Sequence, residues 1–450
     1  MKKFITFTLC LLLCVVTLGL AGCGGGKKET VDTSIASNGN GGMVVTRGDY
    51  VYFVNGYTSY QTYTKDNLDT KFDVAGLYRA KLNANGELDY DDNGSVSGAE
   101  KLSSNLVGFE TTSLYVFGNH IYYTTPITEV NKKGELQTSK IEFRRIKITG
   151  GKAETVYQAK VDATNIDFEF YYAEGKVYLV INEDGTLKRV NCFDKFSVTE
   201  IASDVTSVSL PRDADDVFES DSYKNIFYTK TNDDGNIEIY NYNIATGRDE
   251  YKKTTDYATC ELLDYKFGHL YYKASREQYP SYTYYYRIDA TKNAITSLAE
   301  EKLTSDNSYT NFYFLDNETS GYIAQNDNKT YYLTYNAGGE CDVMPLADSK
   351  LDIIAIKNNY MYFNDGGSIK RINCYEFKLN GNKTQETIIT LDNIETYSYD
   401  IDANNLYVYA TSGDNTYLYS IKVGNILDGE TVEAKLLGVY NEGDAPEVEE

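Results

Sequence analysis

Six oxygen-bearing residues between positions 89 and 100 have the spacing of a calcium-binding loop. The segment DYDDNGSVSGAE fits the pattern D-x-[DN]-x-[DN]-G-x5-E, with Gly94 at the sharp turn. Calcium takes about six to eight hard oxygen ligands, including one main-chain carbonyl and a bidentate glutamate. The flanking segments are typical of strands rather than helices, so a polar hairpin is the alternative. The spacing predicts a structural calcium ion held by Asp89, Asp91, Asn93, Ser95, Ser97 and Glu100.

The four cysteines that follow Cys23 have no CxxC spacing, which disfavours a zinc or redox site. Cys192 in KRVNCF and Cys374 in KRINCY occupy the same place in two strand repeats. These repeats would lie on opposite sides of a ring, too far apart for a bond between the two sulfurs. Buried thiols are therefore expected, and a bridge between Cys260 and Cys341 is the alternative.

The two histidines give no support to catalysis. His120 in FGNHIYY and His269 in FGHLYY fall at nearly equivalent repeat positions, so the repeats account for both. The chain has no Gly-x-Ser-x-Gly elbow and no Walker-type loop. We therefore assign no catalytic residue, and an enzyme is the less favoured class.

The elements that position these residues are eight pairs of strands with alternating apolar and polar residues. Side chains of a strand point to opposite faces with period two, and Asn, Asp and Gly bound the strands. No amphipathic helix is evident after residue 22. The units recur roughly every 50 residues, close to the roughly 40–50 residues of a four-stranded propeller blade. The first strands begin near residues 49, 119, 175, 224, 268, 320, 358 and 404, and the second near 76, 142, 185, 238, 284, 329, 368 and 416.

The repeats predict an all-β, eight-bladed β-propeller over residues 43–440. Blades packed around an axis cover one another's faces and leave short protected edges. The sixth unit is weak, so seven blades are an alternative, and an open solenoid is another. The acidic segment 441–450 is expected to be a disordered tail.

The N-terminus has the features of an export signal. Two lysines precede an apolar run that ends in Leu20-Ala21-Gly22-Cys23, which resembles the lipobox of bacterial lipoproteins. Residues 1–22 would then be a signal peptide, and lipidated Cys23 would anchor the protein to the outer face of the cell membrane. The Gly/Ser/Asn-rich residues 23–42 are predicted to form a flexible tether. An uncleaved transmembrane helix is the alternative.

A net charge of −23 argues against nucleic acid as a partner, because phosphate backbones are bound by basic surfaces. Most of the 44 tyrosines lie in the strand repeats and are expected in the core. The tyrosines outside these repeats are candidates for a contact surface. This candidate surface contains Tyr57, Tyr60, Tyr63, Tyr279 and Tyr282.

The lipobox, the glycine-rich tether and the segments GDYVYF and GLYRAKL resemble exported bacterial lipoproteins with a propeller domain of unknown function. These are distantly similar to the YWTD propellers of low-density-lipoprotein receptors. The resemblance implies a propeller over about residues 44–440 and supplies no catalytic residues. The absence of Trp departs from the YWTD signature. We expect a binding platform for an extracellular protein, with a glycan-binding or glycan-cleaving propeller as the alternative and a purely structural envelope component as the third.

Overall fold

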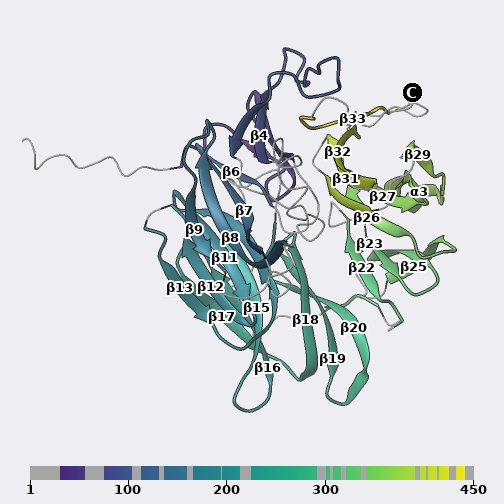
Figure 1. Cartoon of the computed structure of the whole chain (residues 1–450). Coiled ribbons are helices and arrows are strands. Elements are labelled where there is room, and N and C mark those ends of the chain that lie inside the picture. The colour runs from purple at the N-terminus through teal and green to yellow at the C-terminus, as the bar shows by residue number, and fades with distance from the viewer. Residues whose placement is uncertain are drawn as a thin grey trace, which may run out of the picture.

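The computed structural model of the chain describes residues 31–440 apart from 56–75, 104–112, 131–135, 160–165, 194, 213–223, 291–300, 305–307, 316–320, 336–340, 391–395, 402–403, 413–414 and 425–431. In this part of the chain the strands form eight sheets, and each sheet uses strands that are consecutive in sequence (Figure 1). We number the sheets blades 1 to 8 in chain order.

The first four blades contain strands β1 to β17. Blade 1 contains β1 (Ser37–Asn38), β2 (Val44–Arg47), β3 (Tyr50–Asn55), β4 (Gly76–Lys81) and β5 (Glu100–Ser103). Blade 2 contains β6 (Tyr115–Phe117), β7 (His120–Val130), β8 (Leu136–Lys147) and β9 (Glu154–Gln158). Blade 3 contains β10 (Ile166–Ala173), β11 (Lys176–Glu183), β12 (Thr186–Asn191) and β13 (Val198–Ala202). Blade 4 contains β14 (Val205–Ser209), β15 (Asn225–Thr231), β16 (Ile237–Asn243) and β17 (Arg248–Thr254).

The other four blades contain strands β18 to β33. Blade 5 contains β18 (Tyr257–Lys266), β19 (His269–Arg276), β20 (Tyr279–Asp289) and β21 (Glu301–Lys302). Blade 6 contains β22 (Asn311–Phe314), β23 (Tyr322–Gln325), β24 (Thr330–Tyr335) and β25 (Cys341–Ala347). Blade 7 contains β26 (Asp352–Lys357), β27 (Tyr360–Asp365), β28 (Ser368–Asn373) and β29 (Glu386–Thr390). Blade 8 contains β30 (Thr396–Ile401), β31 (Asn405–Ser412), β32 (Asn415–Lys422) and β33 (Ala434–Leu436).

The predicted strand pairs are the second and third strands of blades 2 to 8, and the third and fourth strands, β3 and β4, of the five-stranded blade 1. Each pair forms an antiparallel hairpin, from β3 with β4 in blade 1 to β31 with β32 in blade 8. The weak sixth unit is a complete sheet of four strands, β22 to β25. The prediction of an all-β, eight-bladed propeller is therefore confirmed, and the seven-bladed alternative is wrong.

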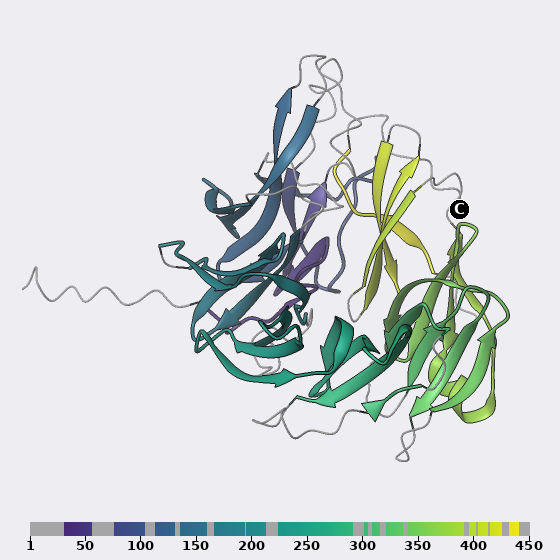
Figure 2. The same cartoon turned by 90° about the horizontal axis from the view of Figure 1, so that it is seen from below.

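Apolar side chains from neighbouring blades pack into shared clusters around the ring. Each of the seven clusters in the described residues joins adjacent sheets. The cluster that contains Phe53 of blade 1 also contains Tyr409 and Leu418 of blade 8. Burial of these side chains gives the main favourable free energy of blade packing. The first and last blades therefore pack together, and Figure 2 shows them next to each other in purple and yellow.

Residues 31–42 belong to the folded body, so the predicted start of the propeller at residue 43 is too late. They include β1, and Asn40 is buried. The Asn40 side-chain oxygen accepts a hydrogen bond from the Val116 amide at 2.6 Å, and Arg212 Nε donates to the Asn40 carbonyl at 2.9 Å. We call this segment the N-terminal strap. Its polar composition is typical of a linker, but hydrogen bonds to blades 2 and 4 hold it in place.

The second strand of each predicted pair has a shared position that is often arginine, which we call the arginine position. In four blades this arginine lies between a tyrosine of the first strand of the pair and a glutamate of the strand that follows the pair. A direct cross-strand pair of opposite charge stabilises a sheet. The four rows are Tyr52–Arg79–Glu100, Tyr122–Arg145–Glu154, Tyr271–Arg287–Glu301 and Tyr362–Arg371–Glu386.

The same arginines connect one blade to the next. The guanidinium of blades 1, 2 and 3 donates a hydrogen bond to a main-chain carbonyl of the next blade. The residue that accepts lies three positions after the arginine position of that next blade. Such charge-assisted bonds are stronger than neutral ones. The bonds run from Arg79 to Ile148 at 3.0 Å, from Arg145 to Cys192 at 3.0 Å and from Arg189 to Ile244 at 2.7 Å.

A short helix, α3 (Cys374–Asn380), follows β28, although no helix was expected there. Asn373 begins it, because its side-chain oxygen accepts from the Glu376 amide at 3.0 Å. Gly381 ends it with a φ of 72°. Seven residues are too few to show a helical period in the sequence. Within the described residues, no helix is both long and apolar enough to span a bilayer.

Candidate functional site

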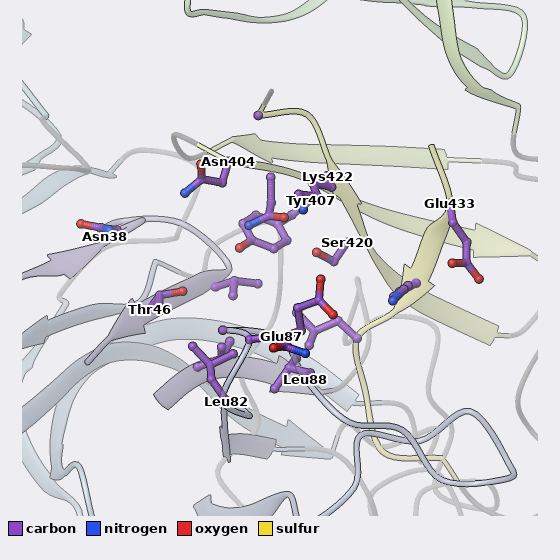
Figure 3. A pocket seen from close by; sticks show the side chains of 18 of the residues that line it. Asn38, Thr46, Leu82, Glu87, Leu88, Asn404, Tyr407, Ser420, Lys422 and Glu433 are labelled. Carbon is purple, nitrogen blue, oxygen red and sulfur yellow. The ribbon is translucent and has the colours of Figure 1, made fainter. Parts of the chain in front are cut away.

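A groove of about 360 Å³ lies between blades 1 and 8 (Figure 3). We call it the seam groove, because the ring closes here between its first and last sheets. Blade 1 and the loop that follows β4 form one wall, and blade 8 forms the other. The side chains used in the arguments below are Leu82 and Glu87 on the first wall, and Tyr407, Ser420, Lys422, Glu433 and Lys435 on the second.

The pattern of blade 8 explains why the seam is packed at one end and open at the other. On the face toward blade 1, Tyr409, Leu418 and Leu437 are buried in the shared apolar cluster. Further along the same face, Ser420 lies directly opposite Tyr407 on one side and Lys435 on the other. Tyr407 still belongs to the shared cluster, but the short Ser420 and the charged Lys435 leave space toward blade 1. The result is a cavity with an apolar wall and a polar wall.

The charges in the seam groove are balanced. Its lining contains the carboxylates of Glu87 and Glu433 and the ammonium groups of Lys422 and Lys435. In Figure 3, Glu87 and Ser420 point into the space between the two blades. Ligand pockets of about 300–1,000 Å³ combine apolar walls with a few converging polar groups. The groove therefore has the size and chemistry to bind one small polar molecule or one side chain of a partner.

The last described residues of the chain lock blade 8 onto blade 1. Asn55 Nδ2 donates to the Val439 carbonyl at 2.7 Å, and the Val96 amide donates to the Gly438 carbonyl at 2.9 Å. The Tyr440 amide donates to Ser95 Oγ at 3.1 Å. We call residues 437–440 the C-terminal clasp. Blades 1 and 8 share no strand, so the clasp and the apolar cluster hold the seam.

The predicted calcium loop forms the blade 1 side of this clasp. Asp91 Oδ1 accepts from the amides of Asn93 and Ser95, each at 2.9 Å, and the Ser95 carbonyl accepts from the Asp91 amide at 2.9 Å. Glu100 begins β5 and pairs with Arg79 at 2.6 Å. The loop is thus a tight turn, and its last predicted ligand, Glu100, forms an ion pair with Arg79 in the row Tyr52–Arg79–Glu100.

The other predicted ligands also have protein partners. The Asp89 carboxylate accepts from Asn83 Nδ2 at 2.9 Å, and its carbonyl accepts from the Ser97 amide at 2.7 Å. Among the described residues, no three His, Cys, Asp or Glu side chains come together as a metal-binding group. The carboxylates of Asp89, Asp91 and Glu100 are therefore not brought together here, and calcium binding stays a prediction of the motif.

Two candidate contact tyrosines, Tyr279 and Tyr282, lie in β20 rather than in a loop. They sit where β20 follows β19, at the end of the long hairpin of blade 5 (Figure 1). Their side chains are 61% and 49% exposed and contact each other edge to face at 6.5 Å. We call this pair the tyrosine tip. The other three candidates, Tyr57, Tyr60 and Tyr63, lie outside the described residues.

An open depression formed by blades 2, 3 and 4 contains one carboxylate, that of Asp167, and one aromatic ring, Phe168. Asp167 Oδ2 accepts from Asn182 Nδ2 at 3.3 Å. Glycoside cleavage by the usual mechanism needs two carboxyl groups about 5–10 Å apart. The lining of this depression therefore does not provide the pair that a glycan-cleaving site requires.

A second acid of the same strand, Glu169, is buried beside the strap. Burial raises its pKa to about 7, opposed by the Arg212 guanidinium and by a hydrogen bond from Tyr115. The pKa of Tyr115 is also raised well above its usual value by burial. Arg212 in turn donates to Asn40 of the N-terminal strap. The polar cluster therefore links the strap to the inner strands of blades 2 and 3.

Glu169→Gln should make the protein less sensitive to pH. Between about 4.5, the usual carboxyl pKa, and about 7, the folded wild-type protein binds more protons than the unfolded chain. Wild-type stability should therefore fall as pH rises through this window, by on the order of 3 kcal/mol. Denaturant titrations at pH 4.5 and 8 should show the variant gaining stability relative to the wild type at the higher pH. A pH-independent difference would contradict a raised pKa of Glu169.

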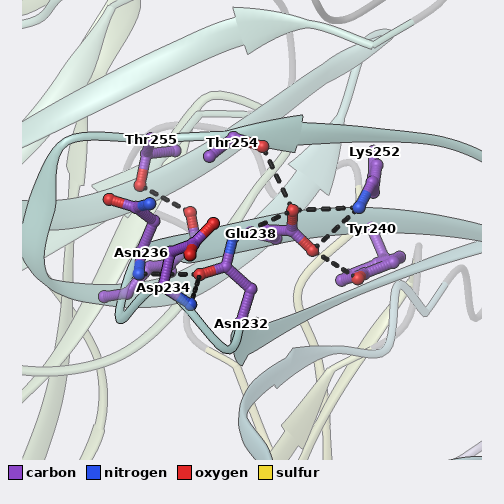
Figure 4. Close-up of polar contacts among 9 residues, drawn as sticks. Asn232, Asp234, Asn236, Glu238, Tyr240, Lys252, Thr254 and Thr255 are labelled. Carbon is purple, nitrogen blue, oxygen red and sulfur yellow. Dashed lines mark hydrogen bonds and ion pairs between the residues drawn. The ribbon is translucent and has the colours of Figure 1, made fainter.

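Glu238 in blade 4 is a carboxylate with a structural role (Figure 4). It accepts from Tyr240 at 2.5 Å, from Lys252 at 2.9 and 3.1 Å, and from Thr254 at 3.1 Å. The Tyr240 hydrogen bond is the largest cause that lowers the pKa of Glu238 to about 2. Glu238 therefore stays ionised and is unsuited to donate a proton near neutral pH. Its hairpin turn begins at Asn232, whose side-chain oxygen accepts from the amides of Asp234 and Asn236 at 3.1 and 2.9 Å.

The cysteines and histidines lie as the repeats predict. Cys192 and Cys374 are buried thiols at equivalent ends of β12 and β28, in blades 3 and 7. Cys260 is also a buried thiol, which contradicts the alternative of a disulfide from this residue. His120 and His269 begin β7 and β19 and contact Tyr122 and Tyr271 with similar geometry, at 6.4 and 6.3 Å. Cys23, the residue predicted to carry the lipid, lies outside the described residues.

No protein-family model matches the chain, and no curated protein matches it. The solved structures that are similar to it include the following three. The β-propeller domain of the Trilobed protease from Pyrococcus furiosus is 11% identical, with a TM-score of 0.42 over 74% of this chain and 99% of that one. A putative TolB from Agrobacterium tumefaciens is 15% identical, with a TM-score of 0.27 over 64% and 87%. A putative 6-phosphogluconolactonase from Bacteroides fragilis is 13% identical, with a TM-score of 0.36 over 71% and 97%.

Proposed function

We propose that the protein is an exported lipoprotein, anchored through Cys23 to the outer face of the cell membrane, whose propeller binds an extracellular protein. The tyrosine tip carries this proposal. Tyrosine is enriched at the energetic centres of protein interfaces, since its ring offers a large contact area with a polar end. Tyr279 and Tyr282 are exposed, although most described tyrosines lie in the core. The eight-bladed ring is a rigid support for such a contact.

The binding role should depend on the tyrosine tip. The double variant Tyr279→Ser, Tyr282→Ser should weaken capture of the partner from cell-surface proteins by about tenfold or more, because hot-spot residues each contribute upward of about 2 kcal/mol. Quantitative pull-down with the full-length protein is the measurement. Tyr375→Ser is the matched control, because Tyr375 is 51% exposed on α3, far along the chain from the tip. Equal capture by all three proteins would rule out the tip as the contact.

Membrane attachment is tested separately. The tetrad Leu20-Ala21-Gly22-Cys23 supports lipidation, and two acyl chains anchor a protein stably where one does not. Cys23→Ala should therefore move the protein from the membrane fraction to the soluble fraction. Fractionation followed by immunoblotting is the measurement. Membrane retention of the variant would point to an uncleaved helix instead of a lipid.

A further inference from the structure

The seam groove coincides with a departure of blade 8 from the repeat. Blades 1, 2, 3, 5 and 7 have arginine at the arginine position. Blades 4 and 6 have Asn241 and Tyr332, and both side chains are buried. Blade 8 has Ser420, opposite Tyr407 and Lys435. A serine is too small to replace an arginine side chain, so this position is left open toward blade 1.

The opposite wall has the residue that a guanidinium would meet. In blades 2, 3 and 4 the carbonyl that accepts from the preceding blade's arginine lies three residues after the arginine position. In blade 1 the residue at this place is Leu82, three residues after Arg79. Leu82 and Ser420 both line the seam groove (Figure 3). The groove therefore lies where a guanidinium from blade 8 would have joined the two blades.

The lining also suits a guanidinium brought by a ligand. Arginine at this position in other blades lies over a tyrosine ring, as for Arg79 over Tyr50 at 5.0 Å and Arg371 over Tyr360 at 4.1 Å. In blade 8 the place of these stacked rings, two residues before the tyrosine of the row, is taken by Asn405. The aromatic ring of the seam groove is that of Tyr407, which belongs to the row itself, and the groove also has the carboxylates of Glu87 and Glu433. Planar guanidinium groups pair with carboxylates and stack on aromatic faces.

The two lysines of the groove indicate that the ligand also carries a negative group. Lys435 occupies the place that glutamate has in the four complete arginine rows, and Lys422 lies two residues after Ser420 on the same strand. A ligand with a guanidinium alone would leave both ammonium groups facing a cation. We propose that the seam groove binds a guanidinium and a carboxylate of one molecule, as in free arginine or in a peptide that ends in arginine.

Ligand-binding measurements test whether the guanidinium charge is needed and whether the ligand is free arginine or a peptide that ends in arginine. Isothermal titration of the whole protein with L-arginine should show binding at least tenfold tighter than with L-citrulline, which has the same shape and no guanidinium charge. Agmatine, which lacks the carboxylate, should also bind more weakly than arginine. Tighter binding of Gly-Gly-Arg than of arginine would identify a peptide end as the ligand, and the reverse would identify the free amino acid. Equal binding of citrulline and arginine, or binding of neither arginine nor Gly-Gly-Arg, would overturn the proposal.

A variant that restores the Tyr–Arg–Glu row in blade 8 tests whether the ligand binds in the seam groove. Ser420→Arg with Lys435→Glu recreates the Tyr–Arg–Glu row in blade 8 and fills the groove from within. It should abolish arginine binding and raise the melting temperature, because the new arginine can join blade 8 to blade 1. Ser368→Arg, at the half-buried first residue of β28 in blade 7, is the matched control and should leave binding unchanged. Unchanged arginine binding in the double variant would place the ligand elsewhere.

This inference stands apart from the proposed protein partner. The seam groove lies between blades 1 and 8, and the tyrosine tip belongs to blade 5. Variants of the tip should leave arginine binding unchanged, and the restored row in blade 8 should leave capture of the partner unchanged. The failure of one proposal can therefore be distinguished from the failure of the other.

Discussion

Truncation after Leu436 should open the ring between blades 1 and 8. The truncation removes Leu437, which is 1% exposed within the cluster that joins the two blades. It also removes the main-chain groups of the C-terminal clasp that bond to Asn55, Ser95 and Val96. Loss of a buried leucine costs about 2–5 kcal/mol, and each hydrogen bond contributes about 1 kcal/mol. We therefore expect the free energy of unfolding to fall by at least about 4 kcal/mol.

Hydrogen exchange would locate the opening. Amides of β2 and β3 in blade 1 and of β31 and β32 in blade 8 should exchange faster in the truncated protein, with little change in blades 4 and 5. Truncation after Tyr440 is the control, since it removes only residues 441–450 and leaves the clasp. Equal stability and equal exchange in the two truncated proteins would mean that the apolar cluster closes the ring unaided.

The sequence predicts the hairpins well because their strands are long enough to show alternation. β3, β11 and β31 have six to eight residues each, and their partners follow after short turns or an insertion. The first and last strands of a blade are different. β6 and β33 have three residues and β21 has two, so no period can be recognised in them. Their places follow from the rule that a blade needs about four strands, rather than from their own residues.

What the local sequence leaves out has a common physical origin. The composition of residues 31–42 indicates a linker, but composition does not reveal that Asn40 bonds to Val116 in a later blade. The spacing of residues 89–100 fits a calcium loop, but it does not reveal that β4 places Arg79 opposite Glu100. In each case a partner distant in sequence determines what the local segment does. Local patterns are insufficient where the register between strands decides the contacts.

The seam groove could have been located in part from the sequence. Aligning LYRAK of β4 with LYSIK of β32 places Ser420 at the arginine position, which marks blade 8 as unusual. The cavity itself could not be predicted, because Leu82 and Ser420 are 338 residues apart and meet only when the ring closes. The sequence does not indicate a strand at the tyrosine tip, because Pro280 is typical of a turn. Pro280 is the second residue of β20, beside a register shift at Arg276 of β19.

Lys188→Met should destabilise the protein by about 3–5 kcal/mol, because it leaves a buried carboxylate without its cation. Lys188 pairs with Glu183, whose side chain is 1% exposed. Tyr157 of blade 2 donates to the same carboxylate at 2.6 Å, so the group also bridges two blades. Water cannot replace the lost charge at this depth. Denaturant titration at pH 7 is the measurement.

A matched pair in blade 7 isolates the effect of burial. Asp365 and Lys370 have the same spacing across the β27–β28 hairpin as Glu183 and Lys188 have across the β11–β12 hairpin, but their side chains are 57% and 24% exposed. Lys370→Met should therefore cost less than about 1 kcal/mol. Adding Glu183→Leu to Lys188→Met should recover most of the loss, since an apolar pair of similar size removes the unpaired charge. Equal losses of stability in the two lysine variants would mean that the burial of Glu183 does not increase the cost of removing its cation.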